Sequence, residues 1–353
     1  MARMVQGQDR LKELLAVKKF QGVDNLTESD TKLAPGFFRT ANNFYIDSEG
    51  MLHMREGIQA ELISGSWHSI WSDNDHSYGV CDGDLVEIDT VNWVASVLVN
   101  GVGNSRMYFI TVGLQTFFSN GIVIGYIDSG VAFGFPDVTQ EFKAKMVGGK
   151  HLEFFNGRLF AVQDRTIFFS DPNAPMVMDM RSNAIPFNAS ITMLKSVADG
   201  MYVSVGEKVV WIGGADPWEK TVNKVRTVLE HPAVEGSAVT FYGDTFPTRK
   251  GPMSEGRTVC FSTPKGIFMG LTGGQLLDCT GDHYGVINAD EATALTRHIM
   301  GYHQYICMSQ FRNEITESSI SIAEPTGGIG FSASQTPVLH FSDPPDLMRF
   351  TVQ

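Results

Sequence analysis

The stretch FFNGRLFAVQDRTIFFSDP, residues 154–172, contains the pattern that decides the fold of this chain. Apolar runs alternate with polar turns at Asn156-Gly157 and Gln163-Asp164-Arg165, and the stretch ends in Ser170-Asp171-Pro172. Asn-Gly favours the backbone of a tight hairpin turn, and proline cannot continue the hydrogen-bond ladder of a strand. The stretch therefore predicts a meander of short antiparallel strands.

The same plan recurs along the chain. In VADGMYVSVGEKVVWIGGADP (197–217), Asp199-Gly200 takes the place of the Asn-Gly turn, and TVCFSTPKGIFMGLTGGQLLDCT (258–280) is a further version. The copies lie roughly 40–50 residues apart, which is the length of a four-stranded propeller blade. One meander alone would expose an apolar face, whereas sheets arranged radially cover one another. The sequence thus predicts an all-β fold, a β-propeller of about six blades, with a range of about five to seven.

Other segments extend this pattern. Residues 42–57, 68–89 and 106–128 are each predicted to form short strands joined by turns, with a hairpin turn at Asn120-Gly121. Residues 303–325 form a degraded copy. The longer segment 216–256 is predicted to hold an extra strand or two and an exposed loop around Pro247–Gly256.

The two ends of the chain differ from the middle. QDRLKELLAVKKF (8–20) has leucines at helical spacing, so we predict a short amphipathic helix that packs on its own domain or docks on a neighbouring subunit. TPVLHFSDPPDLMRFTVQ (336–353) contains two adjacent prolines and is predicted to be an extended arm, which closes the propeller or reaches a neighbour. The predicted domains are a helix and arm at 1–40, the β-propeller at 41–335 and the C-terminal arm at 336–353.

The charge of the chain restricts its partners. The formal net charge is −12 at pH 7, which argues against ordinary nucleic-acid binding because phosphate neutralisation needs a basic surface. An acidic surface is nevertheless suited to a protein past which DNA slides, because it repels phosphate and leaves no counterions to release.

The cysteines argue against a zinc site, and the N-terminus and the apolar runs indicate synthesis in a cytoplasm. Cys81, Cys260, Cys279 and Cys307 are far apart in sequence, so buried thiols are favoured over a zinc site. The N-terminus has no apolar signal segment, and the apolar runs are too short to span a bilayer. We therefore expect synthesis in a cytoplasm and no membrane-spanning segment.

No motif in the sequence predicts a catalytic mechanism. SDNDHSYG (72–79) begins like a calcium loop, but Tyr78 stands where such a loop needs glycine, so a polar hairpin turn is favoured. Asp82 and Asp84 are interpreted as a solvated turn, and His298 and His303 lack metal-ligand spacing. We predict no catalytic, cofactor-binding or metal-ligating residue, no cofactor and no enzymatic activity.

Several motifs, taken in order, resemble a family of tailed-bacteriophage virion proteins. FQGVDNLTESDTKLAPGFFRTANNFYIDSEGMLHMREGI, followed by HSIWSD, resembles the N-terminal region of that family. The stretch at 154–172 resembles its middle repeats, and GRTVCFSTPKGIFMGLTGGQLLDCTGDHY resembles its late blade, so the similarity covers residues 20–285. The single motifs are short, and their order and spacing together carry the resemblance.

This resemblance implies a structural role. The family is similar in plan to the β-propeller proteins of short phage tails, described as tail-nozzle, tail-tube or packaged-DNA-stabilisation proteins. It implies a homo-oligomer, a hexameric ring, that continues the DNA path from the portal and meets adaptor, portal-side or other tail proteins. Double-stranded DNA would pass without specific binding, and the protein would reside in the virion tail after synthesis in the host cytoplasm. The candidate contacts are the N-terminal helix, the Pro247–Gly256 loop and a Pro344–Gln353 arm.

A second reading is a propeller that binds or cleaves glycans of the host surface. Trp67, Trp71 and Trp211 are the candidates for stacking on sugar rings. The chain lacks the Ser-x-Asp-x-Gly-x-Thr-Trp box of sialidase blades, and tryptophan in a blade is more often part of the core. The structural role is therefore the favoured interpretation.

Overall fold

The strands of the chain form separate small sheets in the computed structural model. The structure describes residues 19–27, 32–39, 44–46, 51–54, 63–73, 75–214, 225–242, 247–248, 251–252, 256–280, 289–299, 302–311 and 338–341. Within these ranges there are five four-stranded antiparallel sheets, and a three-stranded sheet follows them. Most of the predicted helix at 8–20 lies outside the described residues, as do most of the predicted arm at 336–353 and the predicted copy at 303–325 beyond Phe311.

The first two large sheets are simple meanders. The first contains β5 (Trp67–Ser72), β6 (Ser77–Cys81), β7 (Asp84–Asp89) and β8 (Val94–Val99). The second contains β9 (Tyr108–Val112), β10 (Gln115–Ser119), β11 (Ile124–Asp128) and β12 (Val131–Gly134). The turn predicted at Asn120-Gly121 joins β10 to β11, and the Asn120 Oδ1 accepts hydrogen bonds from the backbone of Ile122 and Val123. This hairpin prediction is confirmed.

The third and fourth sheets contain the sequence repeats. The third is formed by β14 (Lys150–Phe155), β15 (Arg158–Gln163), β16 (Thr166–Phe169) and β18 (Ala184–Pro186), and the pair β13 (Lys143–Lys145) and β17 (Val177–Asp179) lies beside it. The fourth is formed by β19 (Ile191–Val197), β20 (Gly200–Val205), β21 (Lys208–Gly213) and β22 (Val225–Leu229). Asn156 and Gly157 both adopt positive φ, 45° and 74°, which a tight turn between β14 and β15 requires.

The fifth and sixth sheets complete the series. The fifth contains β23 (Val239–Tyr242), β26 (Arg257–Thr263), β27 (Gly266–Gly270) and β28 (Leu276–Asp278), with a hairpin of β24 (Pro247–Thr248) and β25 (Gly251–Pro252) inserted between β23 and β26. The sixth contains β29 (Ala289–Ile299), β30 (Tyr302–Phe311) and β31 (Val338–Phe341), so part of the predicted C-terminal arm pairs as a strand.

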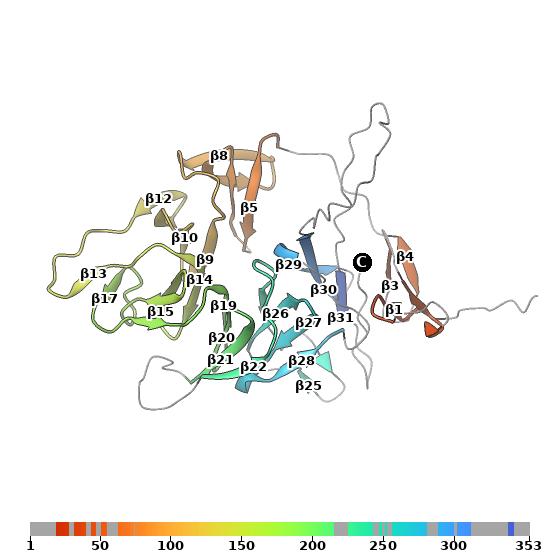
Figure 1. The fold of residues 1–353 in the computed structure, drawn as a ribbon. Coiled ribbons are helices and arrows are strands. Elements are labelled where there is room, and N and C mark those ends of the chain that lie inside the picture. Colours follow the sequence, from red (N-terminus) through yellow and green to blue (C-terminus); the bar gives the residue numbers. More distant parts are fainter. Residues whose placement is uncertain are drawn as a thin grey trace, which may run out of the picture.

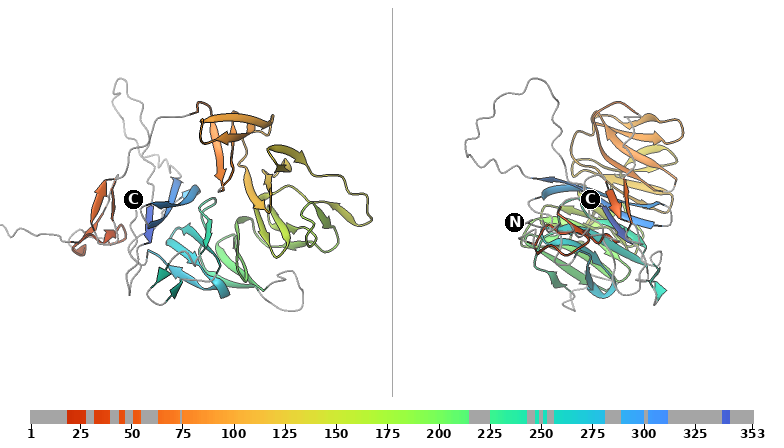
Figure 2. Two further views of the ribbon diagram at one scale, coloured as in Figure 1. Left: turned by 180° about the vertical axis from the view of Figure 1, so that it is seen from behind. Right: turned by 90° about the vertical axis from the view of Figure 1, so that its right-hand side faces the viewer.

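The sheets follow one another around a common centre. Figure 1 shows this order from β5–β8 (orange) through green to β29–β31 (blue). The first strands of successive sheets, β9, β14, β19 and β23, lie against one another, and β23 lies against β29. The smaller N-terminal pairs are β1 (Gly22–Val23) with β2 (Phe37–Phe38) and β3 (Phe44–Ile46) with β4 (Leu52–Met54). They lie outside this series, with β3 against β31 (Figure 2).

The apolar core explains the radial arrangement. One hydrophobic cluster lies between each sheet and the next, from β5–β8 to β29–β31. In β15, Leu159 and Ala161 face the second sheet, whereas Phe160 and Val162 face the fourth. Because alternate residues of a strand point to opposite faces, a middle strand buried on both sides is apolar almost throughout. The chain is thus an all-β protein of the β-propeller type, as the repeats predicted.

Candidate functional site at the propeller axis

The first strands of the sheets bring charged side chains to the propeller axis. We call this group the axial cluster, and its members are Arg106, Tyr108, Lys150, His151, Glu153, Lys195, Ser196, Glu235 and Arg257. They come from β9, β14, β19, β26 and the segments before β9 and β23. The sequence analysis predicted no site residue and missed this cluster.

Glu153 is the centre of the larger ion group. Its side chain is fully buried, and its Oε1 lies 3.0 Å from Nη1 of Arg257 and accepts a hydrogen bond of 3.0 Å from Ser196 Oγ. Its Oε2 lies 3.9 Å from Nζ of Lys195 and has no hydrogen-bond partner. Arg257 Nη1 also donates to Ser196 Oγ and to the carbonyl oxygen of Phe154. The Glu153 carboxylate therefore lies close to two cations, Lys195 and Arg257. The three side chains connect the third, fourth and fifth sheets.

A second group of polar and charged side chains in the axial cluster surrounds Glu235. Its Oε1 accepts a hydrogen bond of 3.1 Å from Tyr108 Oη and lies 3.7 Å from Nζ of Lys150. His151 Nε2 lies 3.6 Å from the same oxygen, and the rings of His151 and Tyr108 are 4.8 Å apart. Arg106 Nη1 donates 2.8 Å to the carbonyl oxygen of Ala292 in β29. These contacts link the second sheet to the fifth and sixth, which are not its neighbours in sequence.

The axial cluster therefore fills the centre of the propeller with side chains. Contacts between non-neighbouring sheets are possible only across the axis. The described side chains therefore leave no passage along this axis wide enough for a double helix.

His151 is neutral at neutral pH. Burial, together with the nearby charges of Lys195 and Lys150, lowers its pKa from 6.5 to about 3. Its contact with Glu235 is therefore not an ion pair, because burial and the cations outweigh the single carboxylate. Burial also lowers the pKa of Lys195, although Glu153 opposes this effect, and burial raises the pKa of Tyr108.

This pKa shift predicts a pH-dependent stability. A group whose pKa is lower in the folded chain stabilises the fold above its unfolded pKa, and this stability is lost as the pH falls. Between pH 6.5 and 5, His151 alone is expected to reduce the free energy of unfolding by about 2 kcal/mol. Because its φ is +51°, we choose His151→Asn, since asparagine tolerates that backbone and does not titrate. Urea unfolding should show a smaller loss over this pH range in the variant, and equal losses in both proteins would contradict the assignment.

A small pocket opens at the other end of the inner strands. Its volume is about 260 Å³, and Arg257 lines it with six other residues, namely Ile110, Thr111, Phe154, Thr240, Phe241 and Tyr242. The walls are mainly apolar, and Nη2 of Arg257 lies 3.5 Å from Thr240 Oγ1. Within the described ranges, no group of three or more His, Cys, Asp or Glu side chains is arranged to hold a metal ion.

The calcium-like segment is a polar turn, as predicted. Asp73 Oδ1 accepts hydrogen bonds from the backbone of Asp75 and His76, and its Oδ2 accepts one from Thr111 Oγ1. Asp82 and Asp84 likewise accept hydrogen bonds, from the backbone of Ser66 and Gly101. The carboxylates of Asp73, Asp82 and Asp84 therefore stabilise turns by accepting hydrogen bonds from the backbone. His298 and His303 occupy paired positions in the β29–β30 hairpin.

Two of the three candidate tryptophans are packed against the core. Trp71 stacks on Tyr78 and Phe109 between the first two sheets. Trp211 packs between the fourth and fifth sheets, with the guanidinium of Arg226 5.0 Å from its ring centre. Trp67 is half-buried, and its Nε1 donates to the carbonyl oxygen of Ile63.

The cysteines form no disulfide. All of them lie in the described part of the chain, and Cys260, Cys279 and Cys307 are buried in one cluster between the fifth and sixth sheets, whereas Cys81 is partly buried. Burial raises the pKa of the Cys260 and Cys279 thiols. The predicted buried thiols are confirmed for these three residues.

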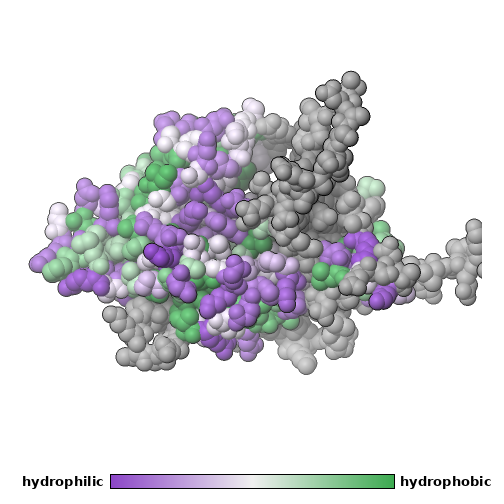
Figure 3. Space-filling view, viewed as in Figure 1, coloured by the Kyte–Doolittle hydropathy of each residue, from purple (hydrophilic) through white to green (hydrophobic). Residues whose placement is uncertain are grey.

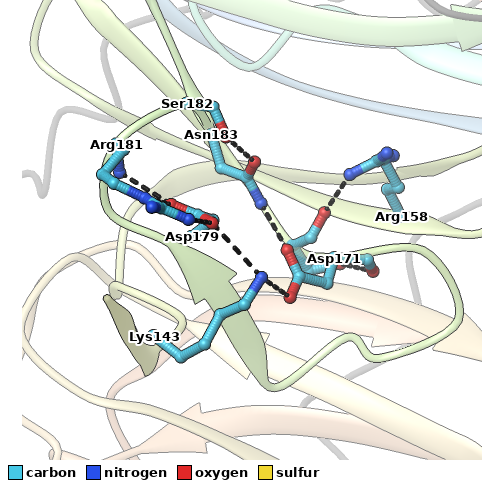
Figure 4. Close-up of polar contacts among 8 residues, drawn as sticks. Lys143, Arg158, Asp171, Asp179, Arg181, Ser182 and Asn183 are labelled. Atoms are coloured by element: carbon cyan, nitrogen blue, oxygen red, sulfur yellow. Dashed lines mark hydrogen bonds and ion pairs between the residues drawn. The ribbon is translucent and has the colours of Figure 1, made fainter. Parts of the chain in front are cut away.

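A polar network attaches β13 and β17 to the third sheet (Figure 4). Lys143 Nζ lies 2.6 Å from Asp171 Oδ2 and 3.4 Å from Asp179 Oδ2. Arg181 binds Asp179 through two side-chain nitrogens, and Asn183 donates to Asp171. The bonds from Arg181 are the main reason that the pKa of Asp179 is lowered. The Ser170-Asp171-Pro172 turn thus ends β16 and also anchors the inserted pair.

Comparison with known proteins yields only structural similarity. The sequence matches no protein-family model and no curated protein. Among solved structures, the extracellular domain of a hybrid two-component system of B. thetaiotaomicron is similar with a TM-score of 0.45 and 11% identity over 72% of this chain. The chain spans only 34% of that protein.

Two further similarities cover most of both chains. The Pan2 WD40 domain of Neurospora crassa has a TM-score of 0.42 and 9% identity, and the similarity covers 69% of this chain and 75% of that one. Virginiamycin B lyase from Staphylococcus aureus has a TM-score of 0.43 and 12% identity, and the similarity covers 78% of this chain and 92% of that one.

None of the helices within the described ranges is long and apolar enough to cross a membrane.

Proposed function

We propose that this chain is a structural subunit of a short phage tail, of the nozzle or tail-tube type. Copies of the chain assemble into a ring around the path of double-stranded DNA and contact adaptor, portal-side or other tail proteins. The observation that carries this proposal is the order of family-like motifs over residues 20–285. The radial β-propeller supports it, because such a fold provides a rigid unit that packs around an axis.

In this proposal, the DNA path lies outside the axis of each propeller. Because Tyr108, Glu235 and Arg106 connect sheets across the centre, the conduit is formed between copies of the chain and not within one copy. The net charge of −12 favours such a conduit, because surfaces that face passing phosphates must not bind them.

An acidic depression on the first sheet is suited to this role. Its volume is about 680 Å³, and it lies between the β5–β6 and β7–β8 turns. Four carboxylate side chains line it, those of Asp73, Asp75, Glu87 and Asp89. This surface repels phosphate at neutral pH, so it is our candidate for a part of the chain that faces the DNA path.

Copy number in purified virions tests the proposal. Quantitative mass spectrometry should find this chain in a fixed ratio to the portal protein, as ring assembly requires. Absence from virions would contradict the proposal. Release of sugar from a host surface polymer by the isolated chain would favour the glycan-cleaving alternative instead.

A further inference from the structure

The pocket beside Arg257 lies on the propeller axis. Its lining comes from β9, β14, β23 and β26, which belong to the second, third and fifth sheets. Because these sheets are not all neighbours in the series, the space that they enclose together lies at the centre. Its volume is about 260 Å³, whereas pockets for drug-sized ligands measure about 300–1,000 Å³, so its size suits a smaller molecule.

Arg257 is the one charged side chain among the described residues that line this pocket. Its Nη1 contacts Glu153, Ser196 and the carbonyl oxygen of Phe154. Within the described ranges, its Nη2 makes a single hydrogen bond, of 3.5 Å to Thr240 Oγ1, which is longer than an ordinary hydrogen bond. The side chain of Arg257 is 29% exposed. This edge of the guanidinium therefore retains N–H donors for a group inside the pocket.

The two threonines of the pocket differ in what they can donate. Thr111 Oγ1 already donates to Asp73 Oδ2 and contacts Thr116 Oγ1. In the described part of the chain, Thr240 Oγ1 takes part only as the acceptor of Arg257, so its own hydrogen is left to donate. Two donors, Arg257 Nη2 and Thr240 Oγ1, thus lie side by side. This arrangement fits the two oxygens of a carboxylate.

The charge of the neighbouring ion group favours an anion. Glu153 lies close to both Lys195 and Arg257, so these three side chains carry one negative and two positive charges. Of the described residues that line the pocket, none is acidic. An anion beside Arg257 compensates the excess positive charge, whereas a cation is repelled.

The walls of the pocket favour an apolar group on that anion. Ile110, Phe154, Phe241 and Tyr242 provide aliphatic and aromatic surface. Inorganic phosphate leaves this surface in water, whereas an aromatic or branched carboxylate covers it. On the face shown in Figure 3, by contrast, hydrophobic residues are scattered among hydrophilic ones. An apolar ligand is therefore better matched by the pocket walls than by that face.

We propose that this pocket binds a small organic carboxylate, with the carboxylate group on Arg257 and Thr240 and an aromatic or branched apolar group against the walls. Such a ligand contacts the second, third and fifth sheets at once. It stabilises the closed propeller, because it binds only the folded chain. This binding site goes beyond the proposed tail function and does not depend on it.

Titration of the purified full chain with 3-phenylpropionate tests the proposal. Calorimetry should give a dissociation constant of about 1 mM or lower. The matched probes are 3-phenylpropionamide, which has the same shape without the charge, and inorganic phosphate, which has charge without the apolar group. Each should bind at least about tenfold more weakly. The methyl NMR signal of Ile110 in the pocket should shift, and that of Ile122, which is 80% exposed between β10 and β11, should not.

Substitutions in the pocket identify the contacts. Arg257 is unsuitable, because its replacement also removes the partner of Glu153. Thr240→Val removes one donor and keeps the size of the side chain, so it should raise the dissociation constant at least about fivefold. Tyr242→Ala should also weaken binding, because Tyr242 lines the pocket but is 60% exposed and lies outside the core. The matched control is Thr227→Val on the outer strand β22, where Thr227 is exposed, and it should bind like the parent chain.

Circular dichroism should show that all three variants remain folded. The proposal is overturned if the parent chain does not bind 3-phenylpropionate at about 10 mM. It is also overturned if the amide or phosphate binds as tightly as the carboxylate, if Thr240→Val binds like Thr227→Val, or if Ile122 shifts and Ile110 does not. Each of these results leaves the virion copy-number test unchanged, so the two proposals can fail separately.

Discussion

Replacing Glu153 with glutamine is expected to lower the free energy of unfolding by about 3 kcal/mol, which is a large part of the stability of an ordinary domain. The carboxylate is fully buried and faces Arg257 at 3.0 Å and Lys195 at 3.9 Å. Removing its charge leaves two partly buried cations without a counter-ion, at the point where three sheets meet. Urea denaturation at pH 7, followed by circular dichroism, measures the loss.

The matched control is a carboxylate at the surface. Asp137 also pairs with a lysine, Lys145, at 3.3 Å, but its side chain is 91% exposed. Asp137→Asn should change the free energy of unfolding by less than about 0.5 kcal/mol, because exposed ion pairs contribute little. If both variants lose equal stability, or if Glu153→Gln is neutral, the axial cluster does not hold the sheets together as described.

Truncating Phe160 to alanine is expected to reduce the free energy of unfolding by about 4 kcal/mol. Phe160 lies in the middle strand β15, is fully buried, and packs in the cluster between the third and fourth sheets, where its ring centre is 5.7 Å from that of Phe169. The loss combines the transfer free energy of the ring with a cavity between two sheets. Thermal or urea unfolding measures it.

Phe133 provides the comparison for this substitution. It lies in the outer strand β12, is 43% exposed and stacks on Tyr126. Phe133→Ala should cost less than about 1 kcal/mol, because the same atoms are already partly in water. A similar loss at both positions would mean that the inner contacts between sheets do not determine stability.

The repeats made the fold class predictable, because turn residues and strand patterns are local. Asn156-Gly157 and Asn120-Gly121 required hairpins where the structure has them. The radial packing followed from strands such as β15 that are apolar on both faces. Sheet boundaries were less predictable, since the inserted pair β13–β17 interrupts the repeat with segments that carry no clear local signal. The β24–β25 hairpin, by contrast, lies in the segment 216–256, where an extra strand or two was predicted.

The axial cluster was not predicted, because its members are distant in sequence and each is an ordinary charged residue. Tyr108 and Glu235 are brought together only when the sheets close around the centre. A signal was nevertheless present. Glu153 in KHLEFF and Lys195 in ITMLKSV are charges inside largely buried strands, and such charges are expected to be paired.

The charge distribution also refines the proposed mechanism. The chain is acidic overall, yet its axis carries Arg106, Lys195 and Arg257 beside two carboxylates. These cations are used for internal contacts and do not form a basic surface for nucleic acid. The repulsion of DNA in the proposed conduit therefore has to come from the outer surface of the propeller, for which the depression around Asp75 and Asp89 is the candidate.

The proposed tail function is tested most directly by a cryo-electron microscopy reconstruction of the virion tail at a resolution that separates β-sheets. The expected result is a ring of several propellers that each fit this structure, with the DNA path between the copies and outside the axis formed by Tyr108, Glu235 and Arg106. A tail reconstruction in which every density is assigned and none fits this propeller would contradict the account. So would DNA density that passes through the centre of a single copy.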